Sequence, residues 1–365
     1  MGVRSCVSCC SWLTAASLMT LLVAVIVGAS LDHIAHVHFD PVTLDPKLAP
    51  LLAPSHLNRK KFAREGFLLV RGLLRGELLR EAQEAGIQEA ARSHLLFDRL
   101  FFAYNKITFN VWQRQLGLAS VAFGSAAPSA AAALLGMKDG RGGALRILKD
   151  AFMAFAPGRT GCGWHVDDKG FWPTLDNQSG GINVWIALSP VRAADGGGLA
   201  LAPRSHVAEW SRKCRDWIAP PGGGAPRTCA MATLSPECHA RFEEVQVTYD
   251  MEPGDAIFLH RGTFHRSADF APHAQDSAPI HRYNIRYVPE ETRLFDNGFE
   301  AVLVRSTDVG HGSALTQAGV YYPQAWPTTL ADERMQLASG LNSEPSVALV
   351  CRKVLRAAIK HLGLV

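Results

Sequence analysis

The sequence predicts an α+β fold in which helices pack against a double-stranded β-helix, a jelly-roll barrel of the cupin-like kind. Two observations carry this prediction. Segments with helical spacing come before Gly136, and short strand-like segments separated by glycine and proline turns come after Ala144. Many short strands with such turns are typical of a barrel that holds its site between two sheets.

The composition indicates an ordered globular chain. Of its 365 residues, 48% are hydrophobic and 19% are charged, which is enough to build one large domain or two small ones. The formal net charge of +4 is spread along the chain and forms no basic stripe. A nucleic-acid partner is therefore not expected.

The N-terminus carries an uncharged segment, from Ser5 to Leu31. A cleaved signal peptide is one interpretation, with Gly28-Ala29-Ser30 as the small residues at the cut. A retained signal anchor is the other, because Ser11–Leu31 just suffices to span a bilayer. The positive charge of Arg4 favours an anchor with a lumenal catalytic domain, and hence a membrane tether or the secretory pathway.

Four regions follow from this organisation. They are the signal anchor or signal peptide at 1–31, a proline-rich stem or linker at 32–60, a folded domain at 61–328, and a tail at 329–365. The tail contains an amphipathic helix, Ser346–Leu362, which we expect to dock on the domain rather than on a membrane surface.

The folded domain is expected to begin with a strand at Phe67–Val70 and a helix at Glu77–His94. The apolar stripe of this helix consists of Leu78, Leu79, Ala82, Ala85 and Ile87. A second helical region covers Asn110–Gly136, where Gly136 is a helix stop.

The strands of the barrel come next. They are predicted at Ala144–Pro157, Gly181–Leu188, Leu199–Pro203, Val245–Tyr249, Ala256–His260 and Arg282–Val288. Alternation along Ile182–Leu188 indicates a half-buried strand. The insertion Val207–Arg241 either covers the mouth of the site or is a variable excursion, and the sequence leaves both open.

Three cysteines, Cys214, Cys229 and Cys238, lie close together in or near this insertion. In a secretory compartment a disulfide among them is plausible, and in the cytosol they would be thiols. The five cysteines after the N-terminal segment, Cys162, Cys214, Cys229, Cys238 and Cys351, form no C-x-x-C pair, so a zinc site is not expected among them.

The chemistry is expected around His165-Val166-Asp167. In an extended strand, residues i and i+2 point to the same face, so this imidazole and carboxylate project together. A further histidine from the distant pair His260 and His265 would complete two histidines and one carboxylate. That donor set, with other positions open, is the one used by non-haem Fe(II) oxygenases.

A basic strand supplies what a 2-oxo acid co-substrate needs. The far carboxylate of such an acid must be held by a cation, and arginine does this best through its two-pronged donor. Arg282, Asn284 and Arg286 alternate on one strand and therefore share a face.

From about Lys61 to Pro327, the chain resembles the phytanoyl-CoA dioxygenase family of Fe(II)/2-oxoglutarate-dependent oxygenases. The resemblance lies in the order and spacing of FAREGFLLVRGLL, GWHVDD, NVWIALSP, PRSH, EPGDAIFLHRGTFHRS and RYNIRYVP.

The resemblance implies that His265, followed by Arg266-Ser267, is the distal iron ligand, and that His260 is a core or supporting residue. It implies Arg282 as the first choice for 2-oxoglutarate and Arg286 as the second. Arg282 lies 17 positions after His265, a longer gap than is usual in the family, so Asp269–Pro279 resembles a small insertion and the choice between the two arginines stays open.

The implied activity is Fe(II)- and 2-oxoglutarate-dependent dioxygenation. The enzyme would use O2 to hydroxylate a C–H bond of a small molecule or lipid, releasing succinate and CO2, with ascorbate as a stimulant. Asp167 points to hydroxylation or a similar oxidation, because related halogenases lack this carboxylate. A catalytically inactive jelly-roll binding or scaffold protein is the alternative, followed by a metal-dependent barrel enzyme that does not use 2-oxoglutarate. The prime substrate and the oligomeric state stay open.

Overall fold

The computed structural model describes residues 57–92, 106–113, 115–137, 143–159, 161–167, 180–218, 231–293, 312–317 and 322–327. The N-terminal anchor or signal, the stem up to residue 56, Cys229 and the tail helix lie outside these ranges. The described fold begins at Leu57, which packs into the main core, and Asn58 caps α2 (Arg59–Glu65) by accepting a hydrogen bond from the Lys61 backbone N–H.

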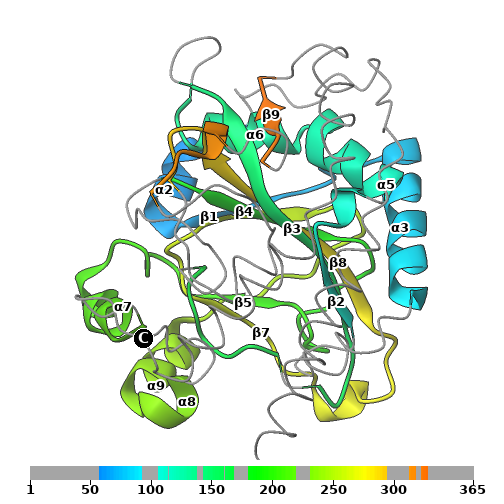
Figure 1. The fold of residues 1–365 in the computed structure, drawn as a ribbon. Coiled ribbons are helices and arrows are strands. Elements are labelled where there is room, and N and C mark those ends of the chain that lie inside the picture. Colours follow the sequence, from blue (N-terminus) through cyan, green and yellow to red (C-terminus); the bar gives the residue numbers. More distant parts are fainter. Residues whose placement is uncertain are drawn as a thin grey trace, which may run out of the picture.

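A large antiparallel sheet forms the centre of the fold (Figure 1). Its order is β1-β6-β4-β8-β3-β2, and β9 also pairs with β3. The strands are β1 (Phe67–Val70), β2 (Lys106–Phe109), β3 (Leu145–Phe155), β4 (Ile182–Ala187), β6 (Ala256–His260), β8 (Ile280–Pro289) and β9 (Gln324–Trp326). A second sheet consists of β5 (Leu199–Leu201) and β7 (His265–Ser267), so the site lies where two sheets meet.

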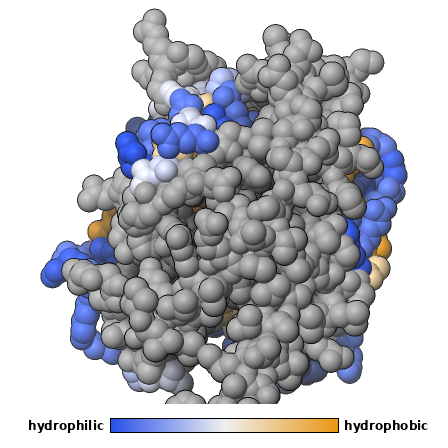
Figure 2. Space-filling model, in the orientation of Figure 1, coloured by the Kyte–Doolittle hydropathy of each residue, from blue (hydrophilic) through white to orange (hydrophobic). Residues whose placement is uncertain are grey.

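Helices cover the outer face of the large sheet. They are α3 (Gly76–Ala91), η2 (Val111–Gln113), α5 (Leu116–Ala119), the π-helical turn η3 (Ser120–Gly124) and α6 (Ala127–Leu134). In Figure 1, α3 and α5 lie together on one side of the sheet. The edge where Figure 1 places α3 is mostly hydrophilic in Figure 2, because this helix turns its apolar side towards the sheet.

The predicted stripe of α3 is confirmed for Leu78, Ala82 and Ala85, which are buried. Ile87 is 60% exposed, so its place in the stripe was wrong. The helical region 110–136 is broken into short pieces, and Gly136 ends it with φ +81°. Within the described residues, Leu116–Leu134 is long and apolar enough to cross a membrane, but 83% of it is buried in the core.

Two strand predictions need correction. All six residues of β4 are buried, not half of them, because helices cover the outer face and the smaller sheet covers the inner one. The predicted strand Val245–Tyr249 is wrong: Val245 ends α9 (Pro236–Val245), and Val247 alone bridges to Leu201.

The insertion and the loop after β7 contain further helices among the described residues. They are η4 (Glu209–Ser211), α7 (Arg212–Ile218), α8 (Met231–Leu234), α9 and η5 (Pro272–Ala274). In Figure 1, α7, α8 and α9 gather beside β5 and β7, away from α3 and α5. A disulfide joins Cys214 to Cys238 with a Cα–Cα distance of 5.8 Å, one of the pairings that the sequence left open.

Candidate active site

Three side chains from two distant segments meet between the sheets. His165 and His265 form an antiparallel backbone bridge, with N–O distances of 3.0 and 2.9 Å between their peptide groups. This bridge brings the imidazole centroids to 4.2 Å of each other. One ligand atom from each of His165, Asp167 and His265 lies within 4.8 Å of the other two, and all three residues are buried.

Backbone carbonyls orient both imidazoles. Nδ1 of His165 lies 2.7 Å from the carbonyl of Gly163, and Nδ1 of His265 lies 3.0 Å from that of Thr263. Since a carbonyl only accepts, each Nδ1 carries the proton and donates, which leaves the Nε2 lone pair for a metal.

Burial keeps these histidines neutral. Desolvation, together with the neighbouring charge of His265, lowers the pKa of His165 to about 3. Desolvation also lowers the pKa of His265. Neutral imidazoles are the form that binds a metal ion.

Asp167 is held as a carboxylate by two side chains. Asn183 donates to Oδ2 at 2.6 Å, and Arg286 donates to Oδ1 at 3.3 Å. Burial alone would raise the pKa of Asp167, but Arg286 and the two histidines outweigh it and lower that pKa well below its usual range. Asn183 and Arg286 stand opposite each other on β4 and β8, so the sheet register places both at Asp167.

The three residues of the basic strand are all buried on one side of β8, as the alternation predicted, yet they have different neighbours. Arg282 donates to Ser267 Oγ at 3.1 Å, two residues beyond His265, and its guanidinium lies 5.6 Å from the Trp185 ring centroid. Arg286 instead contacts Asp167. The insertion between His265 and Arg282 contains η5.

A cavity with an empty volume of about 520 Å³ opens beside these residues. Its walls include the three clustered side chains, Asn183, Ser267 and all three polar residues of β8. Its apolar lining is Ile107, Met153, Cys162, Trp185 and Leu199.

Sequence reasoning missed Asn183 and Ser267 as site residues. Both lie in segments that it had singled out, NVWIALSP and HRS, but an asparagine or serine in a strand carries no metal-binding signal of its own. Asn183 becomes recognisable as a site residue only from its strand pairing with Arg286 and its hydrogen bond to Asp167.

His260 lies outside the cluster. Its ring is 5.0 Å from that of His206, and its Nδ1 accepts from the Gly262 N–H at 3.1 Å. Nε2 of His206 lies 3.1 Å from the Ala63 carbonyl, a contact that holds the turn after β5 against α2.

We expect His260 to make the metal-free protein less stable in mild acid. Burial, with His206 and Arg261 nearby, lowers the pKa of His260 to about 4. Between pH 6.5 and 4 the unfolded chain therefore binds one proton more than the folded chain at this residue, so stability falls as the pH falls. The loss by pH 5 is about 2 kcal/mol. Urea unfolding of wild type and His260→Gln at pH 7, 6 and 5 measures this loss. If the free energy of unfolding fell equally with pH in both proteins, the prediction would be contradicted.

Two histidines and one carboxylate beside a buried arginine, in a cavity between two antiparallel sheets, is the arrangement of the non-haem Fe(II) oxygenase class. The chain belongs to the phytanoyl-CoA dioxygenase (PhyH) family, whose model matches residues 62–270, more than half of its length.

Solved structures confirm the predicted jelly-roll fold. The chain is similar to the non-haem alpha ketoglutarate dependent carbocyclase SnoK from nogalamycin biosynthesis, with a TM-score of 0.56 and 17% identity over 75% of this chain and 98% of SnoK. It is also similar to the epimerase SnoN from the same biosynthesis, with a TM-score of 0.55 and 16% identity over 73% of this chain and 96% of SnoN. No curated protein matches the chain.

Proposed function

We propose that this protein is an Fe(II)- and 2-oxoglutarate-dependent dioxygenase that hydroxylates a C–H bond of a small molecule or lipid, with release of succinate and CO2. The observation that carries the proposal is the buried cluster of His165, Asp167 and His265 beside Arg282. Membership of a dioxygenase family supports the same class of reaction.

The residues present fit an iron ion. Two neutral imidazoles and one carboxylate, each offering one ligand atom, give three of the ligands that Fe(II) takes in this class of site. Asn183 and Arg286 fix the carboxylate from outside. The SnoN epimerase has been crystallised with Fe3+ and alpha ketoglutarate. When bound, the iron would supply the activation of O2. His165, Asp167 and His265 would hold the ion, and Asn183 and Arg286 would orient the Asp167 carboxylate.

The residues also fit 2-oxoglutarate. We assign its far carboxylate to Arg282, with Ser267 beside it, because this guanidinium is buried in the cavity wall and not engaged with Asp167. Asn284 Oδ1 and Arg286 Nη1 are buried without a hydrogen-bond partner among the described residues. Buried polar atoms are normally hydrogen-bonded, so these two atoms could bind polar groups of a ligand in the cavity. Ile107, Met153 and Leu199 would keep water away from the co-substrate.

Hydroxylation is the finer part of the proposal. Asp167 occupies the position that a halogenase leaves open, which favours transfer of oxygen over transfer of halide. The solved relatives are named as a carbocyclase and an epimerase, so the fold also serves other oxidations. Product analysis would separate these outcomes.

We also propose an oxidising compartment for the catalytic domain. The uncharged segment before residue 32 and the buried Cys214–Cys238 disulfide both support it, because disulfides persist in the secretory pathway.

Succinate release tests the function. Purified full-length protein with Fe(II), 2-oxoglutarate, ascorbate and O2 is expected to form succinate slowly even without a prime substrate, and the His165→Ala, Asp167→Ala double variant is expected to form none above background. A wild-type protein that binds neither Fe(II) nor 2-oxoglutarate would favour the scaffold function. Metal-dependent turnover without 2-oxoglutarate would favour a different barrel enzyme. Metabolite profiles of cells with wild type and the double variant would then point to the substrate.

A further inference from the structure

The helical insertion packs directly behind the proposed metal ligands. A small core, separate from the two larger ones, joins it to the strands that carry them. The members that matter here are Trp164, Val166, Phe264, Cys214, Cys238 and Phe242. Trp164 precedes His165 in the sequence and Phe264 precedes His265, so this core holds the neighbours of both histidines.

Phe242 of α9 lies between these two aromatic neighbours. Its ring stacks on Phe264 with centroids 4.2 Å apart and an interplanar angle of 27°. Its centroid is 5.3 Å from that of Trp164 on the other segment. Phe242 is fully buried, so one side chain of α9 contacts both histidine-bearing segments.

Glu243, the next residue, makes the polar counterpart of this contact. Its Oε1 accepts from Trp164 Nε1 at 2.8 Å, and its Oε2 accepts from Arg266 Nη2 at 2.9 Å. Arg266 directly follows His265, and its guanidinium lies 5.5 Å from the Trp164 ring centroid. One carboxylate thus ties the residue before one histidine to the residue after the other.

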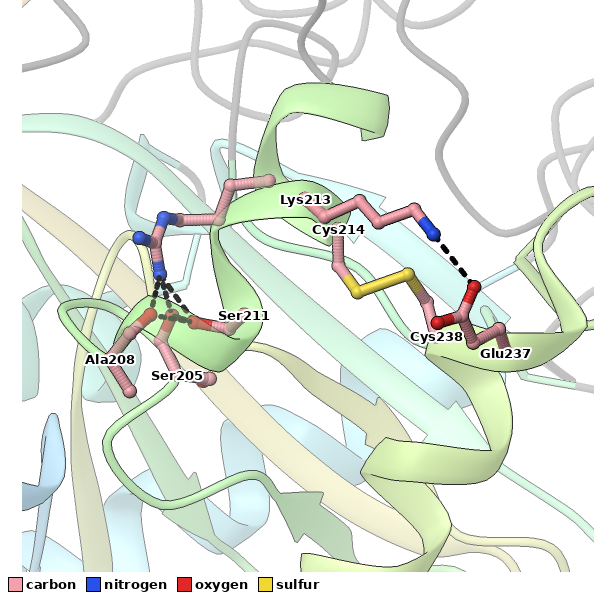
Figure 3. The surroundings of a disulfide bond; sticks show 8 residues. Ser205, Ala208, Ser211, Lys213, Cys214, Glu237 and Cys238 are labelled. Carbon is pink, nitrogen blue, oxygen red and sulfur yellow. Dashed lines mark hydrogen bonds and ion pairs between the residues drawn. A yellow bond between two sulfur atoms is a disulfide. The ribbon is translucent and has the colours of Figure 1, made fainter.

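The disulfide fixes α9 to α7 (Figure 3). Cys238 lies one helical turn before Phe242 and therefore on the same face of α9. Directly before α7, the Ser211 hydroxyl of η4 donates to the Ser205 carbonyl at 2.7 Å. The Ser205 hydroxyl in turn accepts from the Phe264 N–H at 2.8 Å, so hydrogen bonds also link the start of α7 to the neighbour of His265.

We propose that α9 is a brace for the metal site: Phe242 and Glu243 are positioning residues that hold His165 and His265 in register, and the Cys214–Cys238 disulfide holds the brace in place. This proposal rests on the proposed function for the identity of the metal. It follows that removal of the Cys214–Cys238 disulfide by substitution of both cysteines loosens the site and weakens metal binding.

The first arm of the test compares Glu243→Gln with Glu237→Gln. Glu237 lies on the same helix, but it pairs with Lys213 at an exposed position and touches neither histidine segment. Anaerobic titration with Co(II), followed by its visible absorption, gives the affinity and the ligand geometry. We expect Glu243→Gln to weaken Co(II) binding roughly tenfold or more, as outer-shell changes do. We expect Glu237→Gln to bind as wild type does.

The second arm needs no metal. Hydrogen exchange of the metal-free protein is expected to be faster at residues 161–167 and 263–268 in Glu243→Gln and in the double variant Cys214→Ser, Cys238→Ser. Exchange in β3 and β8 is expected to stay unchanged, which separates loss of the brace from general unfolding. A loss of overall stability alone would instead accelerate exchange in all of these segments together.

The outcomes are distinct. Wild-type affinity and wild-type exchange in Glu243→Gln, or uniform acceleration across the chain, would overturn the brace. If wild type binds no Co(II) while the two histidine segments still exchange faster in the variants, the brace stands and the proposed function fails.

Discussion

Glutamine in place of His260 is expected to leave 2-oxoglutarate turnover within about threefold of wild type, whereas alanine in place of His265 is expected to lower it at least 100-fold. His265 contributes a ligand atom to the buried cluster, and His260 does not. Loss of a ligand should exceed the 10–100-fold effect typical of outer-shell partners. Succinate formation and the Fe(II) dissociation constant measure both variants.

This pair of variants decides which of the two neighbouring histidines binds the metal. His260 and His265 lie in one short segment, so a loss of turnover that came from misfolding of this segment would appear in both variants. Thermal unfolding without metal serves as the control, and we expect both variants to remain folded. Turnover that survives in His265→Ala but disappears in His260→Gln would reverse the assignment.

Methionine in place of Arg282 is expected to raise the dissociation constant of 2-oxoglutarate by about 100-fold while Fe(II) binding is retained. The variant would lack the charge-assisted hydrogen bond between the guanidinium and the far carboxylate of 2-oxoglutarate. Loss of one partner of such a buried pair costs about 2–5 kcal/mol of binding free energy, and about 2.7 kcal/mol corresponds to a 100-fold change in the dissociation constant. Anaerobic titration of the Fe(II) protein with 2-oxoglutarate measures the affinity.

Arg286→Met is the matched comparison, and it is expected to behave differently. Because Arg286 donates to Asp167, its loss should weaken Fe(II) binding first. A second probe is 2-oxobutyrate, which has no far carboxylate. It should bind equally to wild type and Arg282→Met. If Arg286→Met loses 2-oxoglutarate while Arg282→Met retains it, the roles of the two arginines are exchanged.

The arrangement of the site could be predicted because its chemistry lies in short local patterns. The alternation of Arg282, Asn284 and Arg286 follows from the two-residue period of a strand, which β8 confirms. The segment of His165 and Asp167 was predicted as an extended strand, but it forms only an isolated bridge, from His165 to His265. The choice of His265 over His260 rested on the family resemblance, and the structure places His265 in the cluster. Most strand positions followed from the same period and from glycine turns.

What the sequence could not provide depends on contacts between distant segments. The burial of both faces of β4 requires knowing that helices cover its outer side. Asn183 becomes a site residue only through its register beside Arg286. Val245–Tyr249 has a strand-like composition, yet the helix that ends there is set by the packing of Phe242 against Trp164 and Phe264.

The most direct measurement is an iron anomalous difference map from crystals of the full chain grown with Fe(II) in the absence of O2. We predict one peak within bonding distance of Nε2 of His165, a carboxylate oxygen of Asp167 and Nε2 of His265. A peak elsewhere, or none at this cluster when iron is in excess, would contradict the account.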